Sequence, residues 1–357
     1  MNCSATDLAE AAVPDPLRLG VDVGRLAEWM DGQGLTGGAI ADLRPLTGGT
    51  QNIVLALSRG GRPFVLRRPP LHLREHSNQT IRREARLLRA LAGTDVPHPT
   101  LIATCEDTGI IGACFYLMEW IEGFNPTVGL PPLHAQNSKV RHGMGLELVD
   151  AALALGAVEY RAAGLEDFGK VDNYLERQVT RWQAQLKDYQ RYQGWPGADE
   201  LPGIAAIAGW LEQHRPASFT PGIMHGDFHI ANALFSFNGP EVAALVDWEL
   251  ATIGDPLIDL GWLLATWPQA DGTGGVFELR PPQGFATHEE LTARYAAASR
   301  RDVSQISWYV VFACFKLGIL LEGTFARACA HQAPMERGKQ LHALALGLFS
   351  QALRRIG

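Results

Sequence analysis

Residues 225–249, HGDFHIANALFSFNGPEVAALVDWE, combine short apolar runs with acidic and amide side chains in a compact pattern. The apolar runs cover 233–237 and 242–246, and the Asn238-Gly239 dipeptide between them is a strong turn signal. The stretch therefore predicts a β-hairpin whose second strand folds back along the first.

Three polar side chains flank this predicted hairpin. Asn232 stands at the start of the first strand and Asp247 just beyond the second, so antiparallel pairing would place them side by side. Asp227 lies upstream on a loop aimed at the same point. Carboxylate and amide oxygens are suitable ligands for Mg²⁺, which makes Asn232 and Asp247 candidate metal ligands. Asp227 is then the candidate catalytic base.

The order of these residues matches that used by protein kinases, with a catalytic Asp, an Asn five residues later and a metal-binding Asp beyond a hairpin. It predicts transfer of a phosphoryl group from ATP, with Mg²⁺, to a hydroxyl group of a small molecule. Two further interpretations stay open: a catalytically silent nucleotide-binding module, and a metal-dependent hydrolase that uses His225, His229 and Asp247. The hydrolase would need more ligands than this stretch supplies, so we expect His225 to orient the loop and His229 to face solvent or substrate.

Length and composition fit a protein of two lobes. The chain has 357 residues, 46% of them hydrophobic and 19% charged. Its net charge of −7 and pI of about 5.9 argue against nucleic acid as a partner. The five cysteines are scattered without zinc-site spacing, and residues 1–20 lack a secretory pattern, so we expect a cytoplasmic protein. The apolar run 306–321 is interrupted by Lys316 and predicts a buried helix rather than a membrane span, and the sequence does not indicate the oligomeric state.

Periodicity and turn signals divide the chain into three parts: a loosely ordered 1–20, a nucleotide-binding lobe 21–122, and a helical lobe 123–357 that carries the metal site and the acceptor pocket. The first lobe is predicted to contain a helix from Asp22 to about 33, strands 51–58 and 63–67, a helix 77–91, and strands 100–104 and 114–120. After a linker over 123–132, helices are predicted at 138–162, 172–193, 199–214, 256–266, 288–299, 304–330 and 335–355. The fold class is α+β: a protein-kinase-like bilobal fold with a small β-rich N-terminal lobe, a larger mainly α-helical C-terminal lobe, and ATP in the cleft between them.

From about Leu46 to Trp267 the chain resembles the aminoglycoside phosphotransferase and choline kinase family, which has this fold. The resemblance rests on the 225–249 stretch and on Gly254-Asp255-Pro256 with Asp259-Leu260. Segments 65–70, 105–107 and 173–182 are most similar to the kinase-like domain fused to certain acyl-CoA dehydrogenases and to stand-alone bacterial relatives. That similarity implies a hydroxyacyl-CoA thioester as acceptor, with an aminoglycoside-type antibiotic kinase as the alternative.

The same resemblance implies several cofactor-binding residues in the N-terminal lobe. Gly48, Gly49 and Thr50 lie where the family's phosphate-covering loop is found, and glycines let backbone N–H groups approach phosphate oxygens. Arg67 occupies the strand position where kinases usually carry a Lys, and Glu84 on the next helix is its expected ion-pair partner. Arginine keeps its charge and binds carboxylate or phosphate in a bidentate manner, so it can serve the same purpose.

Four other residues take positions from the resemblance. Glu119 and Trp120 belong to the segment that links the lobes, whose backbone would hydrogen-bond adenine. Asp255 precedes a proline and is expected to cap the next helix. Asp259, at the start of that helix, is expected to brace the 225–232 loop from behind.

The charge of the C-terminal part offers a clue to the acceptor. Residues 271–357 contain ten Lys and Arg against seven Asp and Glu, although the whole protein is acidic. A polycationic aminoglycoside would favour an acidic pocket, so this excess favours an anionic, partly apolar acceptor. The alternative is that these residues only decorate helix surfaces.

Overall fold

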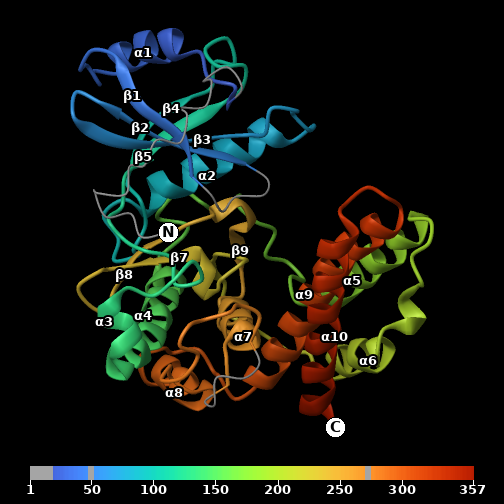
Figure 1. Ribbon diagram of the computed structural model, residues 1–357. Helices are drawn as coiled ribbons and strands as arrows, with labels where there is room; N and C mark the ends of the chain where they lie inside the picture. The colour runs from blue at the N-terminus through green and yellow to red at the C-terminus, as the bar shows by residue number, and fades with distance from the viewer. Residues whose placement is uncertain (1–18, 47–51, 270–274) are drawn as a thin grey trace.

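The computed structural model describes residues 19–46, 52–269 and 275–357 (Figure 1). Most of the segment expected to be loosely ordered, residues 1–18, lies outside these ranges, as do Gly48, Gly49 and Thr50. The elements predicted in these ranges are present, and most helices have shorter ends than predicted, whereas the strand predicted at 63–67 covers Arg62–Arg68.

A five-stranded antiparallel sheet forms the upper part of the molecule in Figure 1, with the strand order β1-β2-β3-β5-β4. The strands are β1 (Ile40–Pro45), β2 (Ile53–Arg59), β3 (Arg62–Arg68), β4 (Leu101–Cys105) and β5 (Phe115–Glu119). Strands β2 and β3 join through Gly60 and Gly61, which both adopt positive φ angles (57° and 75°) as a tight hairpin turn requires. Strand β1 was not predicted, because its residues show no regular alternation of buried and exposed positions.

The helices α1 (Val23–Gly32) and α2 (Ser77–Leu91) cover opposite faces of this sheet. Side chains alternate along β3, so Leu66 belongs to the same buried apolar cluster as Leu26 of α1, whereas Val65 belongs to the cluster that contains Ile81 of α2. Arg67 therefore lies on the α2 face. Arg68 points to the α1 face, where its guanidinium donates to the carbonyl oxygen of Ile111 at 3.2 Å.

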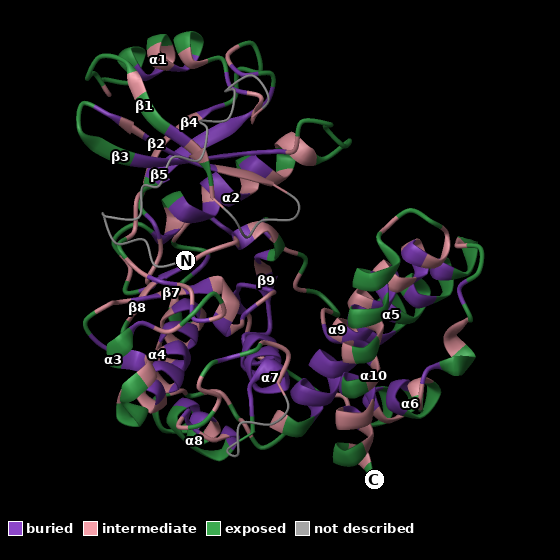
Figure 2. Cartoon of the chain, viewed as in Figure 1, coloured by how far each residue is buried: buried purple, intermediate pink, exposed green. Residues whose placement is uncertain are grey.

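Helices dominate the remainder of the chain. The α-helices are α3 (Pro132–Gln136), α4 (Ser138–Ala157), α5 (Glu176–Asp188), α6 (Ile204–Gln213), α7 (Leu257–Thr266), α8 (His288–Ala298), α9 (Ile306–Cys329) and α10 (Met335–Ile356). Short 3-10 turns occur at Tyr189–Arg191, Ala198–Glu200, Ile230–Asn232 and Trp248–Leu250. Every residue of α7 is buried, and this helix forms the centre of the lower part of the molecule (Figure 2). The α+β bilobal fold class is thus confirmed.

Two small antiparallel pairs organise the region beneath the large sheet. Strands β7 (Ala233–Phe235) and β8 (Val242–Leu245) form the predicted hairpin. Strands β6 (Gly222–Met224) and β9 (Thr252–Gly254) pair outside it and were not predicted. Because β6 and β9 enclose the hairpin, the loop 225–232 and residues 246–251 emerge from the same place.

Helix α9 packs against α5, α6, α7 and α10. By length and apolar composition it could cross a membrane, yet 67% of its most apolar window is buried inside the fold. This burial agrees with the predicted core helix.

Candidate active site

The loop 225–232 is fixed at its beginning by a buried carboxylate. Asp259, in the first turn of α7, accepts hydrogen bonds from the backbone N–H groups of His225 (2.6 Å) and Gly226 (2.9 Å). Burial raises the pKa of Asp259 to about 7. On the other side, the imidazole Nε2 of His225 lies 2.9 Å from the carbonyl oxygen of Val246. Asp259 and His225 therefore have the bracing and orienting contacts that the sequence analysis expected.

Asp227 follows this anchor and has two side-chain partners. The Nδ2 group of Asn232 donates to its backbone oxygen (3.0 Å) and to Oδ2 (3.1 Å), and Nε2 of His229 lies 3.2 Å from Oδ1. Burial opposes ionisation, but His229, His225 and Lys316 outweigh it and hold the pKa of Asp227 well below its usual range. The carboxylate is thus charged at neutral pH and directed by its neighbours.

His229, expected to face solvent or substrate, lies mostly away from solvent. Its side chain is 12% exposed. The ring lies 4.5 Å, centroid to centroid, from the ring of Phe277. Pairing with Asp227 and contact with Phe277 account for this burial.

The ends of the hairpin bring the two candidate metal ligands together. The backbone N–H of Val246 donates to the carbonyl oxygen of Asn232 at 2.9 Å, so Asp247 follows directly beside Asn232. Because the Nδ2 group of Asn232 donates to Asp227, its Oδ1 is left for a cation. One amide oxygen and one carboxylate fit a hard cation that keeps several waters. In the part of the chain that the structure describes, no group of three or more His, Cys, Asp or Glu side chains could hold a metal ion.

Arg67 connects the large sheet to this hairpin. Its Nε lies 2.7 Å from Oε2 of Glu84, and its Nη2 lies 2.6 Å from Oδ1 of Asp247. The Glu84 side chain is 1% exposed and also accepts a 2.9 Å hydrogen bond from the Tyr116 hydroxyl. Burial alone would lower the pKa of Arg67, but Glu84 and Asp247 raise it above the ordinary value. The expected Arg67–Glu84 ion pair is therefore present, and it extends to a candidate metal ligand.

Glu249 is a further acidic residue of the site, to which sequence reasoning assigned no role. Its Oε2 accepts a 3.1 Å hydrogen bond from Nδ2 of Asn52 and lies 3.8 Å from Nη2 of Arg67. Burial, and then the nearby Asp247, raise its pKa to about 7. Carboxylates from 84, 247 and 249 thus surround one guanidinium.

Glu119 and Trp120 stand where β5 ends and the chain leaves the large sheet. The Glu119 carboxylate accepts a 2.6 Å hydrogen bond from the Thr100 hydroxyl. The indole N–H of Trp120 donates to Glu122 at 3.0 Å. Four residues further on, Phe124 forms a backbone bridge to Phe235 of β7, so this segment does join the sheet to the hairpin region.

Lys316 of α9 also reaches the loop 225–232, which the sequence analysis did not foresee. Its Nζ donates to the carbonyl oxygen of Gly226 at 3.2 Å. Burial lowers the pKa of this amine to about 8, against the opposing effect of Asp227 and Asp259. The sequence feature that could have indicated this role is a single charged residue in an otherwise apolar helical run.

Three other basic residues of 271–357 form contacts with residues outside the 225–232 loop. Arg294 pairs with Asp150 at 2.7 Å, Arg280 pairs with the exposed Glu278, and Arg301 donates to the backbone oxygen of Gly156. Arg294 thus links α8 to α4, whereas Arg280 and Arg301 lie on connecting segments.

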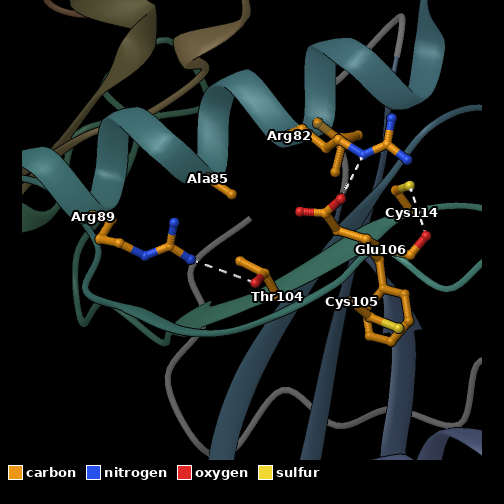
Figure 3. Close-up of a pocket in the computed structure, with 9 residues that line it drawn as sticks. Arg82, Ala85, Arg89, Thr104, Cys105, Glu106 and Cys114 are labelled. Atoms are coloured by element: carbon orange, nitrogen blue, oxygen red, sulfur yellow. Dashed lines mark hydrogen bonds and ion pairs between the residues drawn. The ribbon is translucent and has the colours of Figure 1, made fainter. Parts of the chain in front are cut away.

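Two hollows adjoin these elements. Figure 3 shows a hollow of about 30 Å³ between α2 and β4, where Arg82 of α2 forms an ion pair with Glu106 at 3.1 Å. That volume suits a water molecule and not a nucleotide. The second, of about 520 Å³, is lined mainly by apolar residues, among them Pro268, Val276, Phe277, Leu279 and Pro282, together with Glu278 and Arg280. It adjoins the 225–232 loop through the contact between Phe277 and His229.

Comparison with known proteins agrees with this arrangement. Residues 42–304 match the phosphotransferase enzyme family. Acyl-CoA dehydrogenase family member 10 of Mus musculus is 30% identical over 305 residues, which cover 82% of this chain but only 27% of that protein. The chain thus spans between about a quarter and two fifths of the length of the curated relatives it matches.

Solved structures show the same fold. A Ralstonia eutropha JMP134 protein provisionally described as an aminoglycoside phosphotransferase is 28% identical, with a TM-score of 0.76 over 93% of this chain and 98% of that one. A ternary complex of aminoglycoside phosphotransferase APH(4)-Ia with AMP-PNP and hygromycin B is 14% identical, with a TM-score of 0.56 over 90% of this chain and 98% of that one. Together with the family match, these findings show that the chain belongs to the phosphotransferase enzyme family and has its protein-kinase-like fold.

Proposed function

We propose that the protein is an ATP- and Mg²⁺-dependent phosphotransferase acting on a hydroxyl group of a small molecule. The observation that carries the proposal is the convergence of Asp227, Asn232 and Asp247 at the ends of one hairpin, with Arg67 bound to Asp247. Family membership supports the same class of reaction.

Asp227 would act on the acceptor. Its carboxylate is ionised and is held by Asn232 and His229, so it can orient an acceptor hydroxyl and take its proton. In the proposed phosphoryl transfer, the acceptor oxygen forms a bond to the γ-phosphorus of ATP. At the same time the bond from that phosphorus to the β,γ-bridging oxygen breaks. The products are a phosphate ester, ADP and the proton that Asp227 passes to solvent.

The remaining groups would hold the nucleotide. Asn232 and Asp247 would bind Mg²⁺, which when bound neutralises charge on the phosphates. Arg67 would share that task from the sheet, and the backbone at Gly48, Gly49 and Thr50 would cover the phosphates. The backbone at Glu119 and Trp120 would receive adenine.

We place the acceptor in the hollow of about 520 Å³ beside His229, a volume within the range of small-molecule sites. The apolar residues of its lining favour a hydroxyacyl-CoA thioester over a polycation, while Arg280 is paired with Glu278 in the same lining. The similarity to acyl-CoA dehydrogenase family member 10 supports the same choice, although this chain matches only part of that protein. An aminoglycoside is the alternative, supported by the description of the Ralstonia protein. The free cysteines among the described residues suit a cytoplasmic location.

An ADP-release assay tests the proposal. Hydroxyacyl-CoA thioesters would be set beside kanamycin, choline, homoserine and sugars, with Mg·ATP and with Mg²⁺ removed by chelation. We expect Mg²⁺-dependent ADP release that one class of alcohol stimulates and that Asp227→Asn abolishes. ATP binding without turnover for any acceptor would instead favour the silent module, and release of phosphate from phosphoesters without ATP would favour the hydrolase. Stimulation by kanamycin alone would overturn the choice of acceptor.

A further inference from the structure

Lys316 is the one charged residue in the run 306–321, and its ammonium lies against the loop 225–232. The residue that it contacts, Gly226, directly precedes Asp227. The backbone at Gly226 is already confined, because Asp259 accepts its N–H and a Cβ there would lie 2.3 Å from the carbonyl oxygen of Leu250. A contact at the Gly226 carbonyl is therefore transmitted to Asp227 rather than absorbed by a mobile backbone.

Aromatic rings from two other helices hold the ammonium in place. Its Nζ lies 4.4 Å from the ring centroid of Trp262 in α7 and 5.6 Å from that of Trp182 in α5. Moving an ammonium away from water is costly unless it is paired, so two helices place buried aromatic rings against this cation beside the loop.

We propose that Lys316 is a positioning residue of the transfer site, which fixes the Gly226 carbonyl and thereby sets the orientation of Asp227 toward the acceptor hydroxyl. The inference rests on the proposed function. Its hydrogen bond goes to the backbone on the acceptor side of the loop, whereas the nucleotide side is built from Arg67, Asn232 and Asp247. Loss of the ammonium should therefore reduce turnover and leave ATP binding intact.

The charged groups that face Lys316 are Asp227 from the loop, Asp259 from α7 and Arg181 from α5. The two carboxylates favour the protonated amine, while burial and Arg181 oppose it, and the result is a pKa lowered to about 8. The ammonium is thus present below that pH and is lost above it. Turnover should fall on the alkaline side near pH 8, and Lys316→Arg, which stays charged, should move this fall to higher pH.

The experiment compares Lys316→Met, Lys316→Arg and a control, Lys339→Met, which removes an exposed lysine of α10. ADP release from Mg·ATP would be measured with water and with a hydroxyacyl-CoA as acceptor, Mg·ATP affinity by calorimetry, and hydrogen exchange in peptides covering 222–232. For Lys316→Met we expect a fall in kcat of at least tenfold, Mg·ATP affinity within twofold of wild type, and faster exchange confined to those peptides. Lys316→Arg should recover most of the kcat and the protection, and the control should behave as wild type.

The inference is overturned if Lys316→Met keeps its kcat within threefold and its loop protection, if ATP affinity falls in step with kcat, or if arginine restores no more than methionine. If Lys316→Met does not fold, the pH dependence of turnover is compared between wild type and Lys316→Arg. An alkaline fall in turnover at the same pH in both proteins would contradict the inference. If wild type releases no ADP with any acceptor, the proposed function fails. Hydrogen exchange still judges whether Lys316 fixes the loop, since it needs no turnover.

Discussion

Nη2 of Arg67 lies 2.6 Å from Oδ1 of Asp247, although 180 positions separate the two residues in the chain. The contact joins β3 of the large sheet to the end of the hairpin. Since the same guanidinium is bound to Glu84, a single side chain links the five-stranded sheet, helix α2 and the candidate metal site.

Replacement of Arg67 should be costly for stability. In Arg67→Met the buried Glu84 loses its cation, and removal of one partner of a buried pair typically costs about 3–5 kcal/mol. Urea denaturation should show a loss of this order. The double variant Arg67→Met with Glu84→Met should recover a large part of it, because no uncompensated charge remains. Arg62→Met, an exposed position on the same strand, is the control; equal effects of Arg67→Met and Arg62→Met would contradict the argument.

Asp227→Asn should remove turnover while keeping the nucleotide. The amide cannot accept the acceptor's proton, and loss of a general base typically lowers kcat by about 10²–10⁴. Calorimetry should find Mg·ATP affinity within about twofold of wild type. Asp247→Ala, in contrast, should weaken Mg·ATP binding itself. Equal ATP affinity in Asp247→Ala and wild type would argue against its assignment as a metal ligand.

Asp259→Asn should loosen the 225–232 loop. One amide oxygen cannot replace two carboxylate oxygens that accept from His225 and Gly226, so a buried N–H is left without its partner. Such a loss costs about 1–3 kcal/mol. Thermal denaturation should report it, together with a kcat lowered by tenfold or more and an unchanged KM for ATP. Asp199→Asn, at an exposed position, should change neither quantity.

The stability of the protein should depend on Glu249 in a pH-dependent manner. Burial and Asp247 raise the pKa of this carboxyl to about 7, so between its ordinary value and pH 7 the folded state retains a proton that the unfolded chain has lost. Stability therefore falls as the pH rises through this window. Glu249→Gln should leave the free energy of unfolding unchanged near pH 4 and raise it by about 1–3 kcal/mol at pH 8. A stabilisation that is equal at both pH values would exclude this cause, and Glu200→Gln serves as an exposed control.

The features that neighbouring residues determine, such as turns and helix caps, were predicted from the sequence. The Asn238-Gly239 turn and its flanking runs gave the hairpin, and with it the proximity of Asn232 and Asp247. Asp22 was predicted to start α1, and its carboxylate does accept the N–H of Arg25 at 3.0 Å. Turn chemistry and caps are determined within a few residues, so a single sequence reveals them.

Contacts between distant segments were beyond such signals. Strands β6 and β9 are three residues each, too short to show alternation, and they pair across the whole hairpin. Lys316 meets Gly226 across 90 positions, and only the packing of three helices brings the amine there. His229 is covered by Phe277, which also lies far along the chain. Its burial could not be read from its own neighbours.

Gly226 adopts a φ of +83°, and the Leu250 carbonyl oxygen occupies the space that a side chain would need. A related chain could keep all three polar groups of the site and still be a pseudoenzyme if any other residue stood at this position, because the strand connection would have to open to admit a Cβ. A glycine at position 226 is therefore a marker of catalytic competence that a search for the Asp and Asn residues of the site alone would miss.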